Sequence, residues 1–246
     1  MTTLLTAHCG TISALTLGLP SRTAIPEAKG ALPKGLFVAK APVSAKLKQR
    51  LVNDVESITM LALLRPANTG CTQGGRMPEI LVIGLKLTDK NTPVDVPTEV
   101  IDLIAGQRAS GIVFACVRNA LFEGTVREEC ALAVRRNVPV KPGRPPVTKV
   151  HAGEWHSASE TALALPANVA ELTIDNLWDC LCAQVILDSA DGTNLDERIA
   201  VRDQVIELQA QELKLSRDHQ RAKTPAQRNE IYAKLHKVRT QLAQLG

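Results

Sequence analysis

The stretch Glu79 to Leu87, EILVIGLKL, constrains the fold of this 246-residue chain more than any other. It is too short for a helix of ordinary length, it is rich in Ile, Leu and Val, and turn-forming residues bound both ends. A short continuous apolar run of this kind is typical of a strand that is buried on both faces. The sequence therefore predicts that this segment is the central strand of a sheet.

Helix and strand patterns on either side of this strand predict a small α+β domain. Ser44 is a good N-cap, and apolar residues recur at helical spacing from Leu47 to Leu61, which predicts a helix from Ser44 to Leu64. Further helices are predicted at 99–107 and 169–187, buried antiparallel strands at 111–117 and 128–134, and edge strands at 11–17, 36–39, 149–155 and 161–165.

The polar turn cluster DSADGTN, residues 188–194, predicts a boundary between a domain at 1–190 and a helical hairpin at 195–246. Thr224, Pro225 and Gln227 form the capping box and N1 proline of the second hairpin helix. The spacing between apolar residues along this helix then alternates between four and three residues, which is the pattern of a coiled-coil seam. The seam consists of Ile231, Leu235, Val238, Leu242 and Leu245. Pairing within the hairpin is the simplest use of this seam, but its regularity indicates surplus apolar surface for a protein partner or a second copy.

The complete prediction for the fold class is α+β. A small mixed sheet with about three packing helices is followed by a C-terminal antiparallel helical hairpin that forms a coiled coil.

Composition limits the functional classes. Aromatic residues make up only 2% of the chain, which argues against a single-strand binder that stacks bases on aromatic platforms. The formal charge of +4 permits an acidic or nucleic-acid partner without implying one. The six cysteines are scattered without a CxxC pair, which fits a reducing compartment. No segment has the ~20 apolar residues of a membrane span. The first residues lack the Lys or Arg of a signal peptide. We therefore expect a cytoplasmic protein.

Glu56, Glu79 and Lys86 are the best candidates for a catalytic site. A helix with a Glu, followed by a strand flanked by an acid and a lysine, is similar to a restriction-endonuclease-like core. That core requires an acid-x-Lys sequence on one face of a strand, beside a divalent cation. Seven steps separate Glu79 from Lys86, so they should lie at opposite ends and on opposite faces of the strand. A degenerate metal-dependent nuclease is therefore the alternative interpretation.

Three other groups of residues invite a chemical interpretation. His151, Glu154 and His156 lack the spacing of a metal-binding helix, so a polar strand end anchored by Trp155 is preferred to a metal site. The glycine-rich GCTQGG, residues 70–75, lacks the Lys-Ser/Thr ending of a phosphate-binding loop. Cys116 and Cys130 lie in apolar runs and are expected to be inert thiols. No metal and no cofactor are predicted.

A local basic patch follows the third strand. Its members are Arg135, Arg136, Lys141, Arg144 and Lys149. Prolines between them would hold the segment extended, and the patch could contact phosphate groups. A solvated loop is the more common role of such a run, so nucleic-acid contact is a weaker prediction than partner docking.

Several segments in this order resemble the prokaryotic family called domain of unknown function 4391, and the resemblance covers nearly the whole chain. The segments are LGLPSRTAIPEAKGALPKGLF, KLKQRLVNDVESITMLALLRP, EILVIGLKL, GIVFACV, EECALAV, EWHS and LDSADGTNLDERIA, followed by the closing basic helices. The family has no established activity to assign to particular residues. Its members are often encoded beside helicases and DNA methyltransferases in restriction or phage-defence neighbourhoods, so the resemblance implies an accessory role there.

The preferred interpretation is a non-enzymatic accessory protein of a restriction or phage-defence system. It would dock onto a helicase or DNA methyltransferase through its C-terminal helices.

Overall fold

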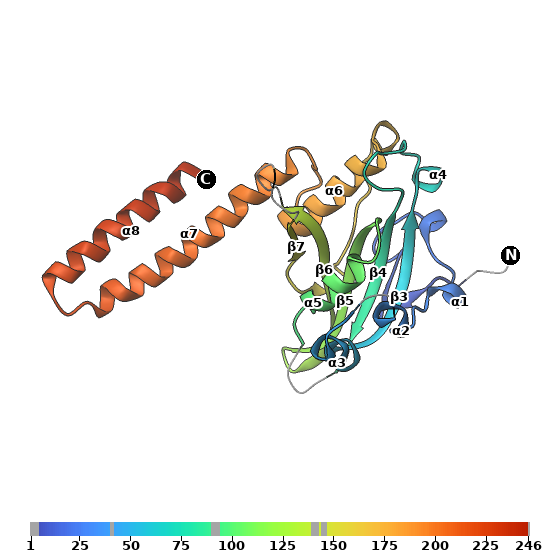
Figure 1. Ribbon diagram of the computed structural model, residues 1–246, viewed down its shortest axis with the longest axis horizontal. Helices are drawn as coiled ribbons and strands as arrows, with labels where there is room; N and C mark the ends of the chain where they lie inside the picture. Colours follow the sequence, from blue (N-terminus) through green and yellow to red (C-terminus); the bar gives the residue numbers. More distant parts are fainter. Residues whose placement is uncertain (1–4, 40–41, 90–93, 139–142, 144–146, 246) are drawn as a thin grey trace. The chain divides into compact units, whose positions relative to one another are not determined.

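A computed structural model describes residues 5–39, 42–89, 94–138, 143 and 147–245 (Figure 1). The chain divides into two compact units, residues 1–193 and residues 194–246. The first unit is a mixed sheet with helices and the second is a pair of packed helices. The α+β fold class predicted from the sequence is therefore confirmed.

A six-stranded mixed sheet forms the centre of the first unit. Its strands are β3 (Val55–Leu64), β4 (Ile80–Leu87), β5 (Gly111–Phe122), β6 (Thr125–Val138), β7 (Val147–Ala152) and β8 (His156–Ser157). β3 to β7 lie side by side in chain order, and β8 pairs with β6. All pairs are antiparallel except β4 with β5, which run parallel and are connected through α5 (Thr98–Ala105). The crossover helix is required because a tight turn cannot connect parallel strands.

The central strand β4 is buried on both faces, as the apolar run predicted. On one face, Leu81, Ile83 and Leu85 pack in a core with α2 (Gly35–Val38), α3 (Ala45–Asp54) and α5. These side chains alternate with residues directed to the other face, because successive residues of a strand point in opposite directions. The helices therefore form one layer over the sheet. Figure 1 labels α3 and α5, two helices of this layer.

A second layer covers the opposite face of the sheet. It includes the short hairpin β1 (His8–Cys9) and β2 (Ile12–Ser13), together with α6 (Ile174–Leu187). A Cβ atom added at Gly84 would lie 2.4 Å from Cβ of Cys9, and one at Gly111 would lie 2.8 Å from the Trp178 ring. The backbone at these two glycines is thus in close contact with β1 and α6, which places both elements on the same face.

The prediction of one helix from Ser44 to Leu64 is wrong beyond Asp54, where the helix ends. Its first half is α3, capped by Ser44, whose side chain accepts a hydrogen bond from the backbone N–H of Leu47. Its second half is β3, which pairs antiparallel with β4. A bulge between Val55 and Ser57 inserts an extra residue, so Val55 and Ile58 both reach the same core although they are three residues apart. This spacing imitates the periodicity of a helix.

Smaller differences lie at the sheet edges. The strand expected at 11–17 is only β2, the one expected at 36–39 is helix α2, and 161–165 forms no strand. The helix expected at 169–187 is a 3₁₀ turn, η2 (Val169–Glu171), followed by α6. The remaining short elements are η1 (Ser21–Thr23), α1 (Glu27–Gly30) and α4 (Pro66–Thr69).

The second unit is a pair of helices, α7 (Leu195–Arg221) and α8 (Pro225–Leu245). The two helices pack together, and Leu208, Leu235 and Val238 are buried. Arg239 of α8 donates to the Glu212 carboxylate of α7 at 2.7 Å. In the part of the chain that the structure describes, no helix has both the length and the apolar character needed to cross a membrane.

We expect Gly84→Ala to lower the free energy of unfolding by about 1–3 kcal/mol, because the new methyl group overpacks the contact with Cys9 in the middle of the sheet. Chemical denaturation measures this change. Gly35→Ala is the matched control, since no atom lies within 4 Å of its Cβ position. Equal effects of the two substitutions would contradict the packing explanation.

Candidate functional site

The structure places Glu79 and Lys86 at opposite ends of β4, in separate ion pairs. The Glu79 carboxylate accepts from Arg65 Nε at 2.7 Å and from Ser110 Oγ at 3.3 Å. Lys86 Nζ donates to Glu128 Oε2 at 3.0 Å. Glu56, expected on a helix, is an exposed residue in the bulge of β3, next to the residue that pairs with Lys86. The geometry does not bring the two acids and the lysine into one site.

Glu128 instead joins the N-terminal hairpin to the sheet. Its carboxylate accepts from the backbone N–H of Thr11 at 2.6 Å and from the Thr11 hydroxyl at 2.5 Å, in addition to Lys86. Gly10 adopts a φ of +59°, and a Cβ atom there would collide with the Glu128 carboxylate. Burial opposes the charge on Glu128, but Thr11 and Lys86 outweigh it and hold the pKa of the carboxyl below its usual value. The lysine therefore has a structural partner.

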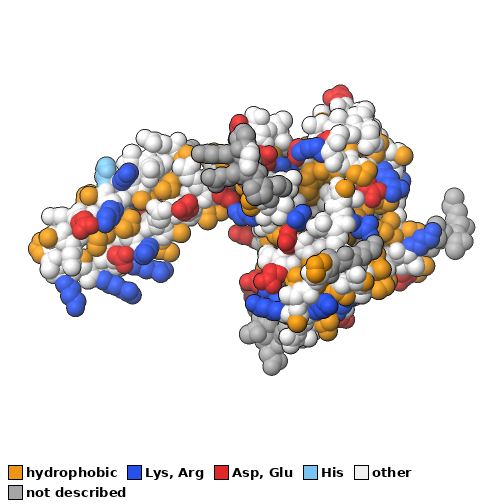
Figure 2. All heavy atoms as spheres, in the orientation of Figure 1, with side chains coloured by type: hydrophobic (Ala, Val, Ile, Leu, Met, Phe, Trp, Pro, Cys, Tyr) orange, Lys and Arg blue, Asp and Glu red, His pale blue; other side chains and the backbone are white. Residues whose placement is uncertain are grey.

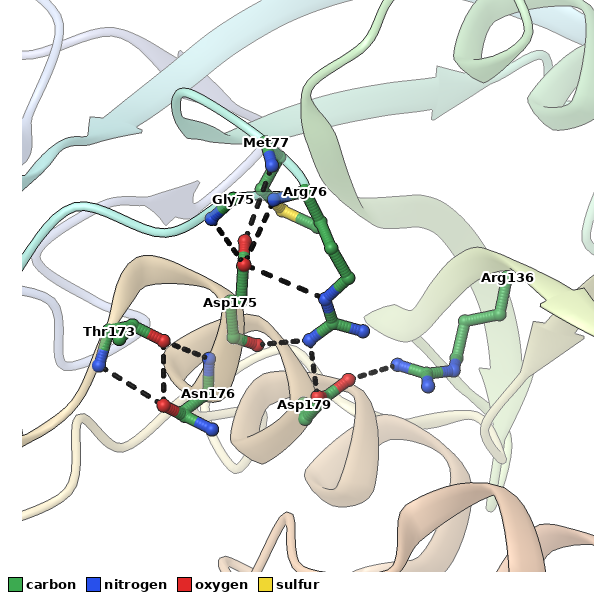
Figure 3. Close-up of polar contacts among 8 residues, drawn as sticks. All are labelled: Gly75, Arg76, Met77, Arg136, Thr173, Asp175, Asn176 and Asp179. Atoms are coloured by element: carbon green, nitrogen blue, oxygen red, sulfur yellow. Dashed lines mark hydrogen bonds and ion pairs between the residues drawn. The ribbon is translucent and has the colours of Figure 1, made fainter.

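The end of the glycine-rich segment and the two residues after it bind an anion, which is a side chain of the protein. Backbone N–H groups of Gly75, Arg76 and Met77 donate to the Asp175 carboxylate at 2.8, 2.9 and 3.2 Å (Figure 3). Asp175 lies in the first turn of α6, which begins at the Thr173 cap. Successive N–H donors of this kind favour an anion. Asp175 thus accepts from all three of these backbone donors.

Two arginines extend this contact into a network of charges (Figure 3). Arg76 donates to Asp179 Oδ2 at 2.6 Å, and Arg136 donates to Asp179 Oδ1 at 2.7 Å. Asp179 is one turn after Asp175, so both acids are on the same side of α6. The network clamps the loop before β4 and the strand β6 to one helix.

The predicted basic patch divides between different environments. Arg136 is only 8% exposed and pairs with Asp179. Arg135, the next residue of β6, points to the other side and donates to Asp102 of α5 at 2.5 Å. Lys149 is on β7, while Lys141 and Arg144 lie outside the described residues. The structure thus directs the two arginines to opposite faces of the sheet and into ion pairs with Asp102 and Asp179.

The remaining titratable candidates do not assemble a site among the described residues. No group of three His, Cys, Asp or Glu side chains in the described ranges could hold a metal ion. His151 is buried on β7, and Trp155 packs on the core, with the Arg118 guanidinium 3.8 Å from its ring centroid. Burial raises the pKa of the Cys130 thiol to about 12 and raises that of Cys116 as well.

The seam of α8 lies partly inside the helix pair. Leu235 and Val238 are buried, whereas Ile231, Leu242 and Leu245 are half-buried. The buried members stabilise the α7–α8 contact, and only the half-buried ones offer surface to another molecule.

We expect Asp175→Asn to lower the free energy of unfolding by about 1–3 kcal/mol at pH 7, because a charged acceptor for three backbone donors is lost. The hydrogen bonds to backbone N–H groups and the charge of Arg76 outweigh burial and lower the pKa of Asp175 in the folded protein. Its contribution should therefore be complete above the unfolded pKa of about 3.9 and should vanish as the pH falls through the lower folded pKa.

Urea unfolding of both proteins between neutral and strongly acidic pH measures this prediction. The matched control is Asp102→Asn, because Asp102 forms an exposed ion pair with Arg135 and such pairs contribute about 0–1 kcal/mol. A difference between wild type and Asp175→Asn that stays constant at all pH values would contradict the role of the charge.

All six cysteines are buried, so we expect them to react far more slowly with a thiol reagent at pH 8 in the folded protein than in denaturant. Burial raises the pKa of Cys9 and Cys182 to about 12, as it does for Cys130. Val52→Cys, at a position that is 62% exposed, provides a reactive control. Rapid labelling of the folded wild-type protein would contradict burial of the thiols.

Comparison with known proteins identifies the family. The chain matches the family described as Domain of unknown function (DUF4391) over residues 17–242. No curated protein and no solved structure was found to match it. The family description gives no activity that could be carried to Glu79, Lys86 or Asp175. Because the match extends over most of the sequence, the chain belongs to the DUF4391 family.

Proposed function

We propose that this protein is a non-enzymatic accessory protein that docks onto a larger DNA-processing enzyme through the α7–α8 helix pair. The observation that supports this proposal is that the helix pair is a compact unit of its own, separate from the sheet domain. The network around Asp175 and the pair formed by Lys86 and Glu128 hold the first unit together. The exposed surface of the helix pair is therefore the better candidate for function.

The charge of α8 indicates what kind of surface it would contact. Between Pro225 and Leu245 the sequence has four basic residues and one acidic residue. Figure 2 shows Lys and Arg side chains gathered along the helix pair near the α7–α8 connection. A basic helix is complementary to an acidic surface and speeds association with it. A helicase or DNA methyltransferase of a restriction or phage-defence system is the partner that the family resemblance implies.

Exposed residues of α8 are the right targets for a test. Leu235→Asp would place a charge in the buried α7–α8 contact, so it would unfold the helix pair rather than test docking. Lys234 and Lys237 are exposed, and reversing their charge leaves Leu235 and Val238 in place.

We expect Lys234→Glu combined with Lys237→Glu to abolish co-purification of the enzyme partner with the full-length protein from its native host. Mass spectrometry of the captured proteins measures the loss, and circular dichroism checks that the variant keeps its helices. The matched control is Lys46→Glu combined with Lys48→Glu, two exposed positions on α3. Retention of a helicase or methyltransferase by the α8 variant would refute docking through this surface, as would its absence from the wild-type sample.

A further inference from the structure

Helix α7 has a second apolar stripe that does not face α8. The stripe consists of Ile206, Ala210 and Leu213, and all three residues are exposed, with Ile206 at 47% and Leu213 at 55%. Leu208, which is buried in the helix pair, lies roughly 160° around the helix from Ile206. The stripe therefore occupies the side of α7 opposite the α8 contact.

This stripe has a nearly symmetric sequence centred on Ala210. Ile206 lies four residues before it and Leu213 three residues after it, while Asp203 and Arg217 lie seven residues before and after. The steps from Asp203 to Arg217 alternate three and four, so the five residues form one seam. When two copies of such a helix align in opposite directions about Ala210, a residue that precedes Ala210 meets one that follows it.

That alignment matches apolar with apolar residues and acids with bases. Ile206 meets Leu213 of the second copy, and Asp203 meets Arg217. On the flank of the same stripe, Glu207 meets Lys214. The pattern extends along the helix, because residues 195–212 contain five acidic and two basic residues, whereas residues 213–221 contain three basic and one acidic.

We propose that α7 binds a second copy of this chain, antiparallel and centred on Ala210, to form a two-fold symmetric dimer. A two-fold interface uses the same patch on both copies, which is what a self-complementary seam provides. A parallel pair would instead oppose Asp203 with Asp203 and Arg217 with Arg217. The charges of the stripe thus select both the partner and the direction.

The helix pair buries few apolar side chains by itself, which also favours a second copy as the partner of α7. Among the described residues from 200 onwards, the buried apolar side chains are Leu208, Leu235 and Val238. Helices of this length gain most of their stability from packing an apolar face, and a second copy would cover Ile206 and Leu213. The dimer that we propose uses residues of α7, whereas the proposed docking surface is on α8. The dimer therefore does not rest on the proposed function.

Sedimentation velocity of the full-length protein over a concentration series tests the dimer directly. We expect the weight-average mass to rise from that of one 26.5 kDa chain toward twice that value. Asp203→Arg alone and Arg217→Asp alone should each weaken association by about tenfold or more, since each change acts at two symmetry-related places. The combined swap should restore it. Gln204→Arg, an exposed position outside the stripe, is the control.

Engineered cysteines test the direction. Under mild oxidation, Ala210→Cys should give a disulfide-linked dimer, because the two copies meet at this residue. Ile206→Cys should not, since the two thiols would be separated by about 12 Å along the helix, beyond disulfide reach. The native cysteines are buried and should stay unlinked.

Three results would overturn the proposal. One is a protein that remains a single chain at all concentrations tested. Another is a charge swap that fails to restore association. The third is equal cross-linking through positions 206 and 210, which indicates a parallel pair. Loss of an enzyme partner in the α8 variant would leave these measurements unchanged, so the two proposals can fail independently.

Discussion

Burial of β4 on both faces is the constraint on which the rest of the first unit depends. A strand in this position needs two covering layers, and the chain provides them from distant segments. Helices α3 and α5 cover one face, whereas the β1–β2 hairpin and α6 cover the other. The N-terminal segment and the last helix of the unit therefore lie on the same face of the sheet, over different strands, and polar contacts hold them there.

Carboxylates that accept backbone N–H groups make those polar contacts. Glu128 holds the β1–β2 turn, and Asp175 holds the loop before β4. Each carboxylate also pairs with a basic side chain, Lys86 or Arg76. A charged acceptor forms stronger hydrogen bonds than a neutral one, so two side chains can fix the β1–β2 turn and the loop before β4. The lysine and the glycine-rich loop that invite a catalytic interpretation in the sequence are engaged in this way.

The sequence predicted the elements whose signal is local. The apolar run of β4, the cap at Ser44 and the second hairpin helix each depend on neighbouring residues, and the structure contains all three. The prediction failed at β3, because a bulge gave the strand a spacing of three. It also missed Asp175, which lies 98 to 100 residues from the loop that it binds. A glycine pair and an acid in a helical first turn are each common, and only the fold shows that they meet.

Helix α7 has two apolar stripes on opposite sides. One stripe packs on α8, and in the dimer that we propose the other packs on α7 of a second copy. The four helices would then lie in the order α8, α7, α7, α8, with each α8 directed away from the two-fold axis. In this order, neither α8 would be covered by the helix pair of the other copy. Two linked surfaces bind a partner with repeated sites more tightly than one surface, because the second contact forms at high effective concentration. Self-association through α7 would therefore strengthen docking through α8 without sharing any residue with it.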